Sequence, residues 1–169
     1  MSVHREVVIL ATGGTIDTVY SRDGRLEIGP PAAPALLAPA GLAGSVPVAS
    51  VVAKESSDLT ADDREALVAH LAALADVGVV VTHGTDTMTV TAEYLLAHPD
   101  VPDSLTVVLT GAMQPAVMRD SDAPFNLGGA VIAAQTLPPG IYLVMSGRVF
   151  RAGEVTKNRA EGRFEDLRP

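Results

Sequence analysis

The sequence predicts an α/β fold in which a mostly parallel sheet lies between two layers of helices. Short runs of β-branched and small apolar residues alternate with segments of helical periodicity, as in a parallel sheet with helical crossovers. The polar clusters follow directly after the strand-like runs. The 169 residues, 47% of them hydrophobic, suit one domain spanning residues 1–169, because a single core commonly serves about 100–150 residues.

The first predicted strand, Val7–Ala11, ends in the sequence Thr12-Gly13-Gly14-Thr15. Two glycines let the chain turn sharply and approach a ligand closely, because no Cβ stands in the way. Open α/β sheets bind ligands at the carboxyl ends of their strands. We therefore expect the two threonine hydroxyls to lie at a ligand site.

The polar segment 17–27 is predicted to be a mobile loop beside the end of the first strand. It carries Asp23-Gly24, a common turn sequence. Tyr20 lies within this loop, so a loop that folds back would bring its ring over Thr12. A proline-rich stretch, residues 29–47, follows as a tether with a short helix at Leu36-Leu37.

A second strand is predicted over Val46–Ala53, followed by the polar cluster Lys54–Asp58. The next segment, Leu59–Ala75, has leucines at the spacing of one helical face. Thr60 with Asp63 three residues later is typical of a helix start. A helix is therefore expected to lead to the next strand.

The remaining elements continue the alternation. Strands are predicted at Val77–Val81, Leu105–Thr110 and Ile141–Met145, and helices at Met88–Ala97 and Asn126–Leu137. We expect Asp86 in the first turn of the helix after the third strand, where the helix dipole favours negative charge. The tail GRVFRAGEVTKNR predicts a β-hairpin that turns at Ala152-Gly153.

The composition excludes several classes of function. The formal net charge of −8 repels phosphate groups, which argues against nucleic acid or an anionic membrane as partner. Without cysteine there is no thiol catalysis, disulfide or thiolate metal site. No segment approaches the roughly 20 apolar residues that a spanning helix needs. We therefore expect a soluble, cytoplasmic protein.

Metal and nucleotide sites have little support in the sequence. The four histidines, at 4, 70, 83 and 98, are scattered, and His83 is expected to be structural. Gly13-Gly14 lacks both the phosphate-binding lysine and the GxGxxG spacing of nucleotide sites. We therefore expect no metal and no cofactor.

The polar groups that gather at the strand ends suit acyl transfer instead. They are Thr12, Thr15, Ser56, Asp58, Thr85, Asp86 and Lys157. A threonine hydroxyl is a weak nucleophile at neutral pH and needs a positioned base. A buried lysine supplies one when it is neutral, and an aspartate holds it in place.

Five segments, in this order along the chain, are similar to motifs of one family. They are ILATGGTI at 9–16, KESSDLT at 54–60, VVTHGTDTM at 80–88, LTGAMQP at 109–115 with SDAPFNL at 121–127, and EVTKNR at 154–159. The chain thus resembles the bacterial-type L-asparaginases, threonine amidohydrolases that act on linear amides and include glutaminase-asparaginases. It is most similar to their single-domain, short-chain forms. The resemblance implies a three-layer α/β/α fold like the family's N-terminal domain, of the flavodoxin or Rossmann type.

The resemblance also implies an activity and its residues. L-Asparagine would be hydrolysed to L-aspartate and ammonia through an acyl ester on Thr12, with Thr85, Asp86 and Lys157 as the proton relay. Thr85 remains open as the primary nucleophile. Tyr20 would be the loop tyrosine of the catalytic set. Substrate binding would fall to Gly13, Ser56, Ser57, Asp58, Gly84 and Ala112. Ser56 would bind the substrate carboxylate, and N–H groups around Gly84 would stabilise the oxyanion. Asp86, besides its place in the relay, would bind the substrate ammonium.

The chain departs from the resemblance in three respects. Family members are about twice as long, and their second domain supplies an acid to a neighbouring active site. Ser57 stands where glutamine is common, and Leu26 holds the register position of the loop tyrosine. We expect weak substrate gripping, hence a high KM and little or no glutaminase activity. The polar, charged end of the chain predicts a complete protein, and apolar helices such as Ala123–Leu137 predict a homodimer.

Two other functions remain as alternatives. The chain could be a binding module for an amino acid that has lost turnover, although binding alone needs no lysine behind the threonine–aspartate pair. It could also be an amide hydrolase that supplies ammonia to an amidotransferase partner. The sequence leaves the preference for asparagine or glutamine open.

Overall fold

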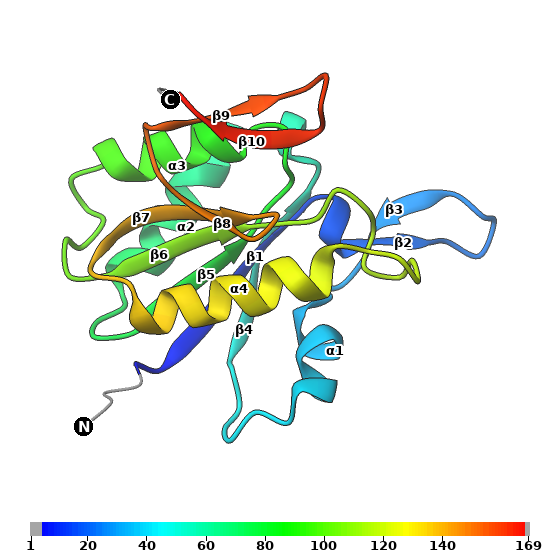
Figure 1. Cartoon of the computed structure of the whole chain (residues 1–169), viewed down its shortest axis with the longest axis horizontal. Coiled ribbons are helices and arrows are strands. Elements are labelled where there is room, and N and C mark those ends of the chain that lie inside the picture. The colour runs from blue at the N-terminus through cyan, green and yellow to red at the C-terminus, as the bar shows by residue number, and fades with distance from the viewer. Residues whose placement is uncertain (1–4, 168–169) are drawn as a thin grey trace.

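The fold, a computed structural model that describes residues 5–167, is a six-stranded sheet with helices on both faces (Figure 1). The strands run in the order β4-β1-β5-β6-β7-β8, and all neighbours are parallel except the final pair. Counted along the chain, the parallel part has the order 2-1-3-4-5 of flavodoxin-like folds. This arrangement confirms the predicted α/β class with a mostly parallel sheet.

The strands of the large sheet are β1 Val7–Gly13, β4 Val48–Lys54, β5 Gly78–Thr82, β6 Thr106–Thr110, β7 Gly140–Met145 and β8 Arg148–Arg151. Two small antiparallel pairs stand beside it, β2 Thr18–Tyr20 with β3 Leu26–Ile28 and β9 Val155–Asn158 with β10 Arg163–Asp166. The α-helices are α1 Ala33–Leu37, α2 Ala61–Ala72, α3 Met88–Ala97 and α4 Ala123–Thr136. Three short 3-10 turns complete the described chain, η1 Thr15–Asp17, η2 Ala38–Ala40 and η3 Ser56–Asp58.

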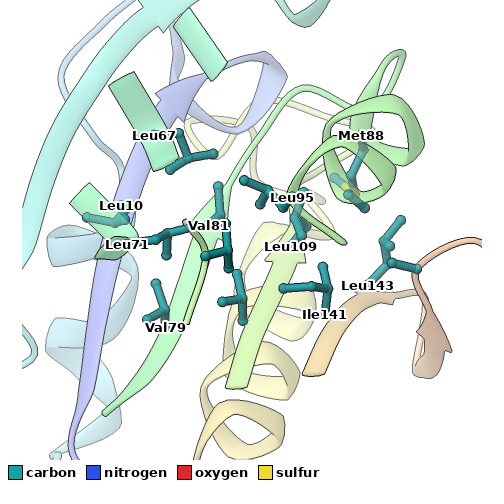
Figure 2. Close-up of a cluster of buried hydrophobic side chains, with 14 of the residues drawn as sticks. Leu10, Leu67, Leu71, Val79, Val81, Met88, Leu95, Leu109, Ile141 and Leu143 are labelled. Carbon is teal, nitrogen blue, oxygen red and sulfur yellow. The ribbon is translucent and has the colours of Figure 1, made fainter. Parts of the chain in front are cut away.

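Alternate residues of each strand enter two separate cores. Leu10, Val79 and Val81 point toward α2 and α3 (Figure 2), whereas Ile9 and Val80 belong to the core beneath α1 and α4. This period of two is the consequence of the strand pleat. A sheet buried on both faces explains why the strands read as continuous apolar runs.

The crossover from β6 through α4 to β7 is left-handed. Helices α3 and α4 each connect neighbouring parallel strands in the same direction, yet they cover opposite faces of the sheet (Figure 1). The two crossovers therefore have opposite hands. Left-handed crossovers make up only about 2% of such connections, so the sequence pattern alone could not predict this one.

The segment after β1 is a β-hairpin rather than an irregular loop. Strands β2 and β3 pair from Thr18 to Ile28, and the turn at Asp23-Gly24 is confirmed by the left-handed Gly24 (φ 80°). The hairpin projects from the side of the molecule (Figure 1). The short helix in the proline-rich tether is also confirmed, as α1.

The predicted helix starts are correct at two sites and late at one. Thr60 caps α2 in a capping box with Asp63, as the sequence indicates. Helix α3 begins at Met88, also as predicted. Helix α4 begins at Ala123 instead of Asn126. Its second residue is Pro124, which fits a first turn because the N–H it lacks would have no helical partner there.

The prediction of a hairpin turning at Ala152-Gly153 is wrong. Strand β8 pairs antiparallel with β7. The two strands are joined by a two-residue turn at Ser146 and Gly147, which both have positive φ (53° and 75°). Two such residues form the turn that matches strand twist best. The chain then passes Gly153 and forms a second hairpin from β9 and β10.

Two threonines in neighbouring strands offer a matched test of this packing. Thr82 and Thr110 are paired in register and are both buried. The Thr110 hydroxyl donates to the Val144 carbonyl at 2.8 Å. Of the buried side-chain oxygens and nitrogens in residues 5–167, only Thr82 Oγ1 has no hydrogen-bond partner.

We expect Thr110→Val to lower the free energy of unfolding by about 1 kcal/mol, because a made hydrogen bond is lost. Thr82→Val should be neutral or stabilising, because it removes a hydroxyl that is buried without a partner. Urea unfolding of the two variants measures the difference. Equal destabilisation by both would contradict this account.

Candidate active site

The candidate site lies where the order of the strands reverses. From β1 the chain first adds β4 on one side, and later adds β5 on the other. The carboxyl ends of β1 and β5 meet at this point, with Ala11 paired to Thr82. In open α/β sheets this switch point is where ligands bind.

Glycines let three main-chain segments approach one another there. A Cβ on Gly14 would lie 2.3 Å from the Cα of Gly84, and a Cβ on Gly84 would lie 2.7 Å from the Oγ of Ser56. Gly13 and Gly14 also have positive φ, 92° and 80°. The turn after β1, the turn after β5 and η3 are therefore in direct contact, as the glycine-rich sequence predicts.

Lys157 joins Thr85 to Asp86. Its Nζ donates to Thr85 Oγ1 at 2.8 Å and to Asp86 Oδ1 at 2.6 Å. Thr85 is buried and the lysine side chain is only 10% exposed, whereas the Asp86 side chain is 51% exposed. The hydrogen bond from Lys157 holds the pKa of Asp86 below its usual range. The three predicted relay residues are thus brought together.

The sequence predicts Asp86 in the first turn of α3, and this prediction is wrong. The helix begins at Met88 with Thr87 as its N-cap, so Asp86 precedes the cap. The position frees its carboxylate to face the β9–β10 hairpin, which carries Lys157. An ion pair with Lys157 thus replaces the expected interaction with the helix dipole.

Thr12 lies beside this group without touching the lysine. It is 2% exposed, and its hydroxyl donates to the Thr82 carbonyl at 2.9 Å. Among residues 5–167 the hydroxyl that contacts Lys157 is that of Thr85.

The segment predicted to grip a carboxylate is held against the turn after β5. Ser56 is buried, its Oγ accepts from the Thr87 N–H at 3.3 Å, and its carbonyl accepts from the Thr87 hydroxyl at 2.6 Å. Its own hydroxyl proton is not used by that contact. Ser57 and Asp58 are exposed on the same 3-10 turn.

Two other predicted residues lie apart from the relay. Tyr20 is 60% exposed on β2 and makes no hydrogen bond through its side chain within the described part of the chain. Leu26, which holds the register position of the family's loop tyrosine, pairs with Tyr20 across the hairpin and is also exposed. Ala112 is buried in a small core with Ile16.

His83 belongs to a buried chain of hydrogen bonds behind the site. Its Nδ1 lies 2.7 Å from the Gly84 carbonyl and its Nε2 lies 2.8 Å from the Thr91 hydroxyl, which also accepts from Arg64 at 3.0 Å. Burial lowers the pKa of His83 to about 4, so the ring is neutral at pH 7. This agrees with the expected structural role.

Sequence reasoning missed two charged residues at the site. Arg159 Nη1 lies 3.3 Å from Asp86 Oδ1, and because Arg159 is in the turn after β9, no local sequence signal predicts this contact. Asp17 is the other. Its side chain is buried, and its Oδ1 accepts from the Ala32 N–H at 2.8 Å.

An apolar hollow elsewhere in the described part of the chain lacks this chemistry. The hollow, of about 440 Å³, lies between β4 and α2, lined by residues such as Val48 and Leu74. It contains no nucleophile beside a base, so the polar edge is the better candidate despite that cavity. Within residues 5–167 no group of three histidines or acids is placed to hold a metal ion. None of the helices there is both long and apolar enough to cross a membrane.

The fold and the site define an α/β protein with a threonine–lysine–aspartate cluster at its topological switch point. The chain belongs to the asparaginase family, whose N-terminal domain ("Asparaginase, N-terminal") matches residues 6–164. This match confirms the family that the sequence resembles.

The chain is similar to proteins of several organisms. It is 37% identical over 163 residues to a probable L-asparaginase of Deinococcus radiodurans, an alignment that covers 89% of this chain and 47% of the relative. It is 38% identical over 88 residues to an L-asparaginase of Thermococcus kodakarensis, covering 50% of this chain and 26% of the relative. The solved structure of the thermostable L-asparaginase from Thermococcus kodakarensis superposes with a TM-score of 0.79 at 28% identity, covering 95% of this chain and 51% of that one. The chain thus spans about half or less of the length of these relatives.

Asp17 generates a pH-dependent prediction for stability. Burial raises the pKa of Asp17 to about 6, although the N–H groups of Ala32 and Gly13 act in the opposite direction. Between the ordinary value of 3.8 and about 6, the folded state binds more protons than the unfolded state, so stability falls as pH rises.

We expect the wild-type protein to lose about 2–3 kcal/mol relative to Asp17→Asn between pH 4 and pH 7. Asparagine keeps a side-chain oxygen for the Ala32 N–H but does not ionise. Urea unfolding at a series of pH values measures the gap between the two proteins. A gap that does not change with pH would contradict the raised pKa.

Proposed function

We propose that the chain hydrolyses the side-chain amide of L-asparagine to L-aspartate and ammonia. The observation that carries the proposal is the placement of Lys157 Nζ, 2.8 Å from Thr85 Oγ1 and 2.6 Å from Asp86 Oδ1. A hydroxyl joined to a lysine that a carboxylate orients is the arrangement that activates a weak oxygen nucleophile. Membership of the asparaginase family supports the same reaction.

The reaction would proceed through an ester on threonine. The attacking oxygen forms a bond to the amide carbon, and its proton passes through the Thr85 hydroxyl to Lys157, which is the base in the fraction of molecules whose lysine amine has given up its proton. The lysine then protonates the leaving nitrogen, which departs as ammonia. Water, activated by the same amine, hydrolyses the ester, releases the aspartate and restores the threonine hydroxyl.

Thr12 is the first candidate for the attacking residue. It sits at the carboxyl end of β1, where the turn through Gly13 and Gly14 brings the main chain close to the Thr85 segment. Thr85 remains the alternative, because Lys157 already contacts its oxygen. In either case, we propose that N–H groups around Gly84 face the oxyanion, which commonly contributes the largest share of such catalysis.

Substrate binding would depend on a small number of groups. Ser56 has a hydroxyl proton free for the substrate carboxylate, with Ser57 and Asp58 beside it on η3, and Asp86 would hold the ammonium. A charge-assisted hydrogen bond contributes about 1.5–3 kcal/mol, so each of these few contacts is worth roughly ten- to a hundredfold in binding. We therefore propose a KM in the millimolar range. Glutamine, which is longer, should be hydrolysed weakly or not at all.

The oligomeric state and the cellular location are also proposals. Phe125 and Ile132 on α4, with Val149 on β8, are exposed apolar residues around a hollow of about 500 Å³. A second copy of the chain would cover this face, in a cytoplasmic homodimer. Light scattering that shows only a monomer at micromolar concentration would contradict the dimer.

The relay gives the direct test of the proposed activity. We expect Lys157→Met to lower kcat for ammonia release from L-asparagine about 10²–10⁴-fold, because general acid–base catalysis contributes that much. Lys54→Met is the matched control, since Lys54 forms its ion pair with Asp63, away from Thr85. It should keep kcat within about threefold of the wild type.

Thermal unfolding of both variants separates lost chemistry from lost folding. An Asp86 left without its lysine remains half exposed, so Lys157→Met should stay folded. A folded Lys157→Met variant with wild-type kcat would contradict the relay. A wild-type protein that binds L-asparagine but releases no ammonia would instead favour the binding-module alternative.

A further inference from the structure

Asp86 is shared by two cations. Lys157 Nζ lies 2.6 Å and Arg159 Nη1 lies 3.3 Å from the same carboxylate oxygen, Oδ1. The second guanidinium nitrogen, Nη2, donates to the Asp86 carbonyl, also at 3.3 Å. Arg159 therefore approaches both the side chain and the main chain of Asp86, beside the buried Thr85 hydroxyl.

The β9–β10 hairpin fixes the direction of Arg159. Lys157 lies in β9, Arg159 is in the turn that follows this strand, and both side chains contact Asp86. Between them, Asn158 fastens the turn, since its Oδ1 accepts from the Glu161 N–H at 3.1 Å and its Nδ2 donates to Glu165 at 3.1 Å. The arginine is thus held at the site by the same hairpin that delivers the lysine.

The acids of this hairpin, Glu161, Glu165 and Asp166, form no ion pair with Arg159 among the described residues. Glu165 is engaged by Arg163 at 2.9 Å and by Asn158. Among the described ion pairs, Arg159 has Asp86 as its partner. Lys157, Arg159 and Asp86 together carry one net positive charge at the mouth of the site, on a chain whose formal net charge is −8.

The charge of Arg159 is open to solvent beside Asp86. The Arg159 side chain is 67% exposed, so the donors not used on Asp86 face the solvent from which a substrate arrives. An anionic group would be attracted to that guanidinium. An ammonium group would have to share Asp86 with two cations that already occupy it.

We propose that Arg159 is a specificity-determining residue that favours anionic amides and weakens the requirement for a substrate ammonium. The inference rests on the proposed amide hydrolysis and names its substrate class. The class is short monoamides that carry a carboxylate, with or without an amino group. Succinamate, which is asparagine without its amino group, is the simplest member.

The test compares two amides in three proteins. Arg159→Gln keeps most of the stem and removes the charge. We expect kcat/KM for L-asparagine to rise about threefold and kcat/KM for succinamate to fall about threefold, since exposed charge contacts have effects of this size. The ratio of the two values should therefore change about tenfold. Arg159→Lys should keep the ratio within about threefold of the wild type, because it keeps the charge.

Arg163→Gln is the matched control in the same hairpin. It removes an equal charge that faces Glu165 instead of Asp86, so the ratio should stay at the wild-type value. A ratio unchanged in Arg159→Gln, or changed equally by Arg163→Gln, would overturn the inference. A parallel loss of both substrates in Arg159→Gln would also overturn it, because a merely structural role predicts that result.

Product binding separates this inference from the proposed reaction. Calorimetric titration with L-aspartate and with succinate needs no turnover. Arg159→Gln should bind succinate more weakly and L-aspartate more tightly than the wild type. If the wild type releases no ammonia yet shows this shift, the proposed reaction is wrong, and the charge preference of Arg159 remains as a property of binding. If ammonia is released and the shift is absent, the inference about Arg159 is wrong and the proposed reaction stands.

Discussion

The close approach of three main-chain segments is the constraint on which the site depends. Gly14, Gly84 and Ser56 are packed so tightly that a Cβ on either glycine would overlap its neighbour. This contact fixes the turn after β1 against the turn after β5, and therefore fixes Thr12 relative to Thr85. Any hydrolysis that uses both hydroxyls requires this spacing, because misplacing a reacting group by about 1 Å can cost a hundredfold in rate.

The second part of the site comes from the far end of the chain. Lys157 is 72 residues from Thr85 in sequence, and it is carried by a hairpin outside the main sheet. Val155 and Phe164 anchor that hairpin in the core beneath α2 and α3. The relay is therefore complete only when the central strands and the last hairpin have both folded. The same hairpin brings Arg159 to Asp86, so the proposed relay and the proposed charge selection share one support.

The sequence predicts the features that depend on local pattern. Strand-like runs, the Thr60 capping box and the glycine turn after β1 are such features, and the structure has them. The tail was predicted wrongly because Ser146 and Gly147 form a tight turn, which let β8 pair with β7 instead. The left-handed crossover and the contact of Arg159 with Asp86 depend on the arrangement of distant segments. No local pattern encodes either of them.

The central claim is that residues gathered at this one edge perform acyl transfer to a threonine. The most direct measurement mixes the protein with L-asparagine, stops the reaction with acid and maps the resulting peptides by mass spectrometry. The account predicts a β-aspartyl ester on Thr12, whereas an ester on Thr85 would make that residue the attacking one. Release of ammonia with no ester on either threonine would contradict the claim.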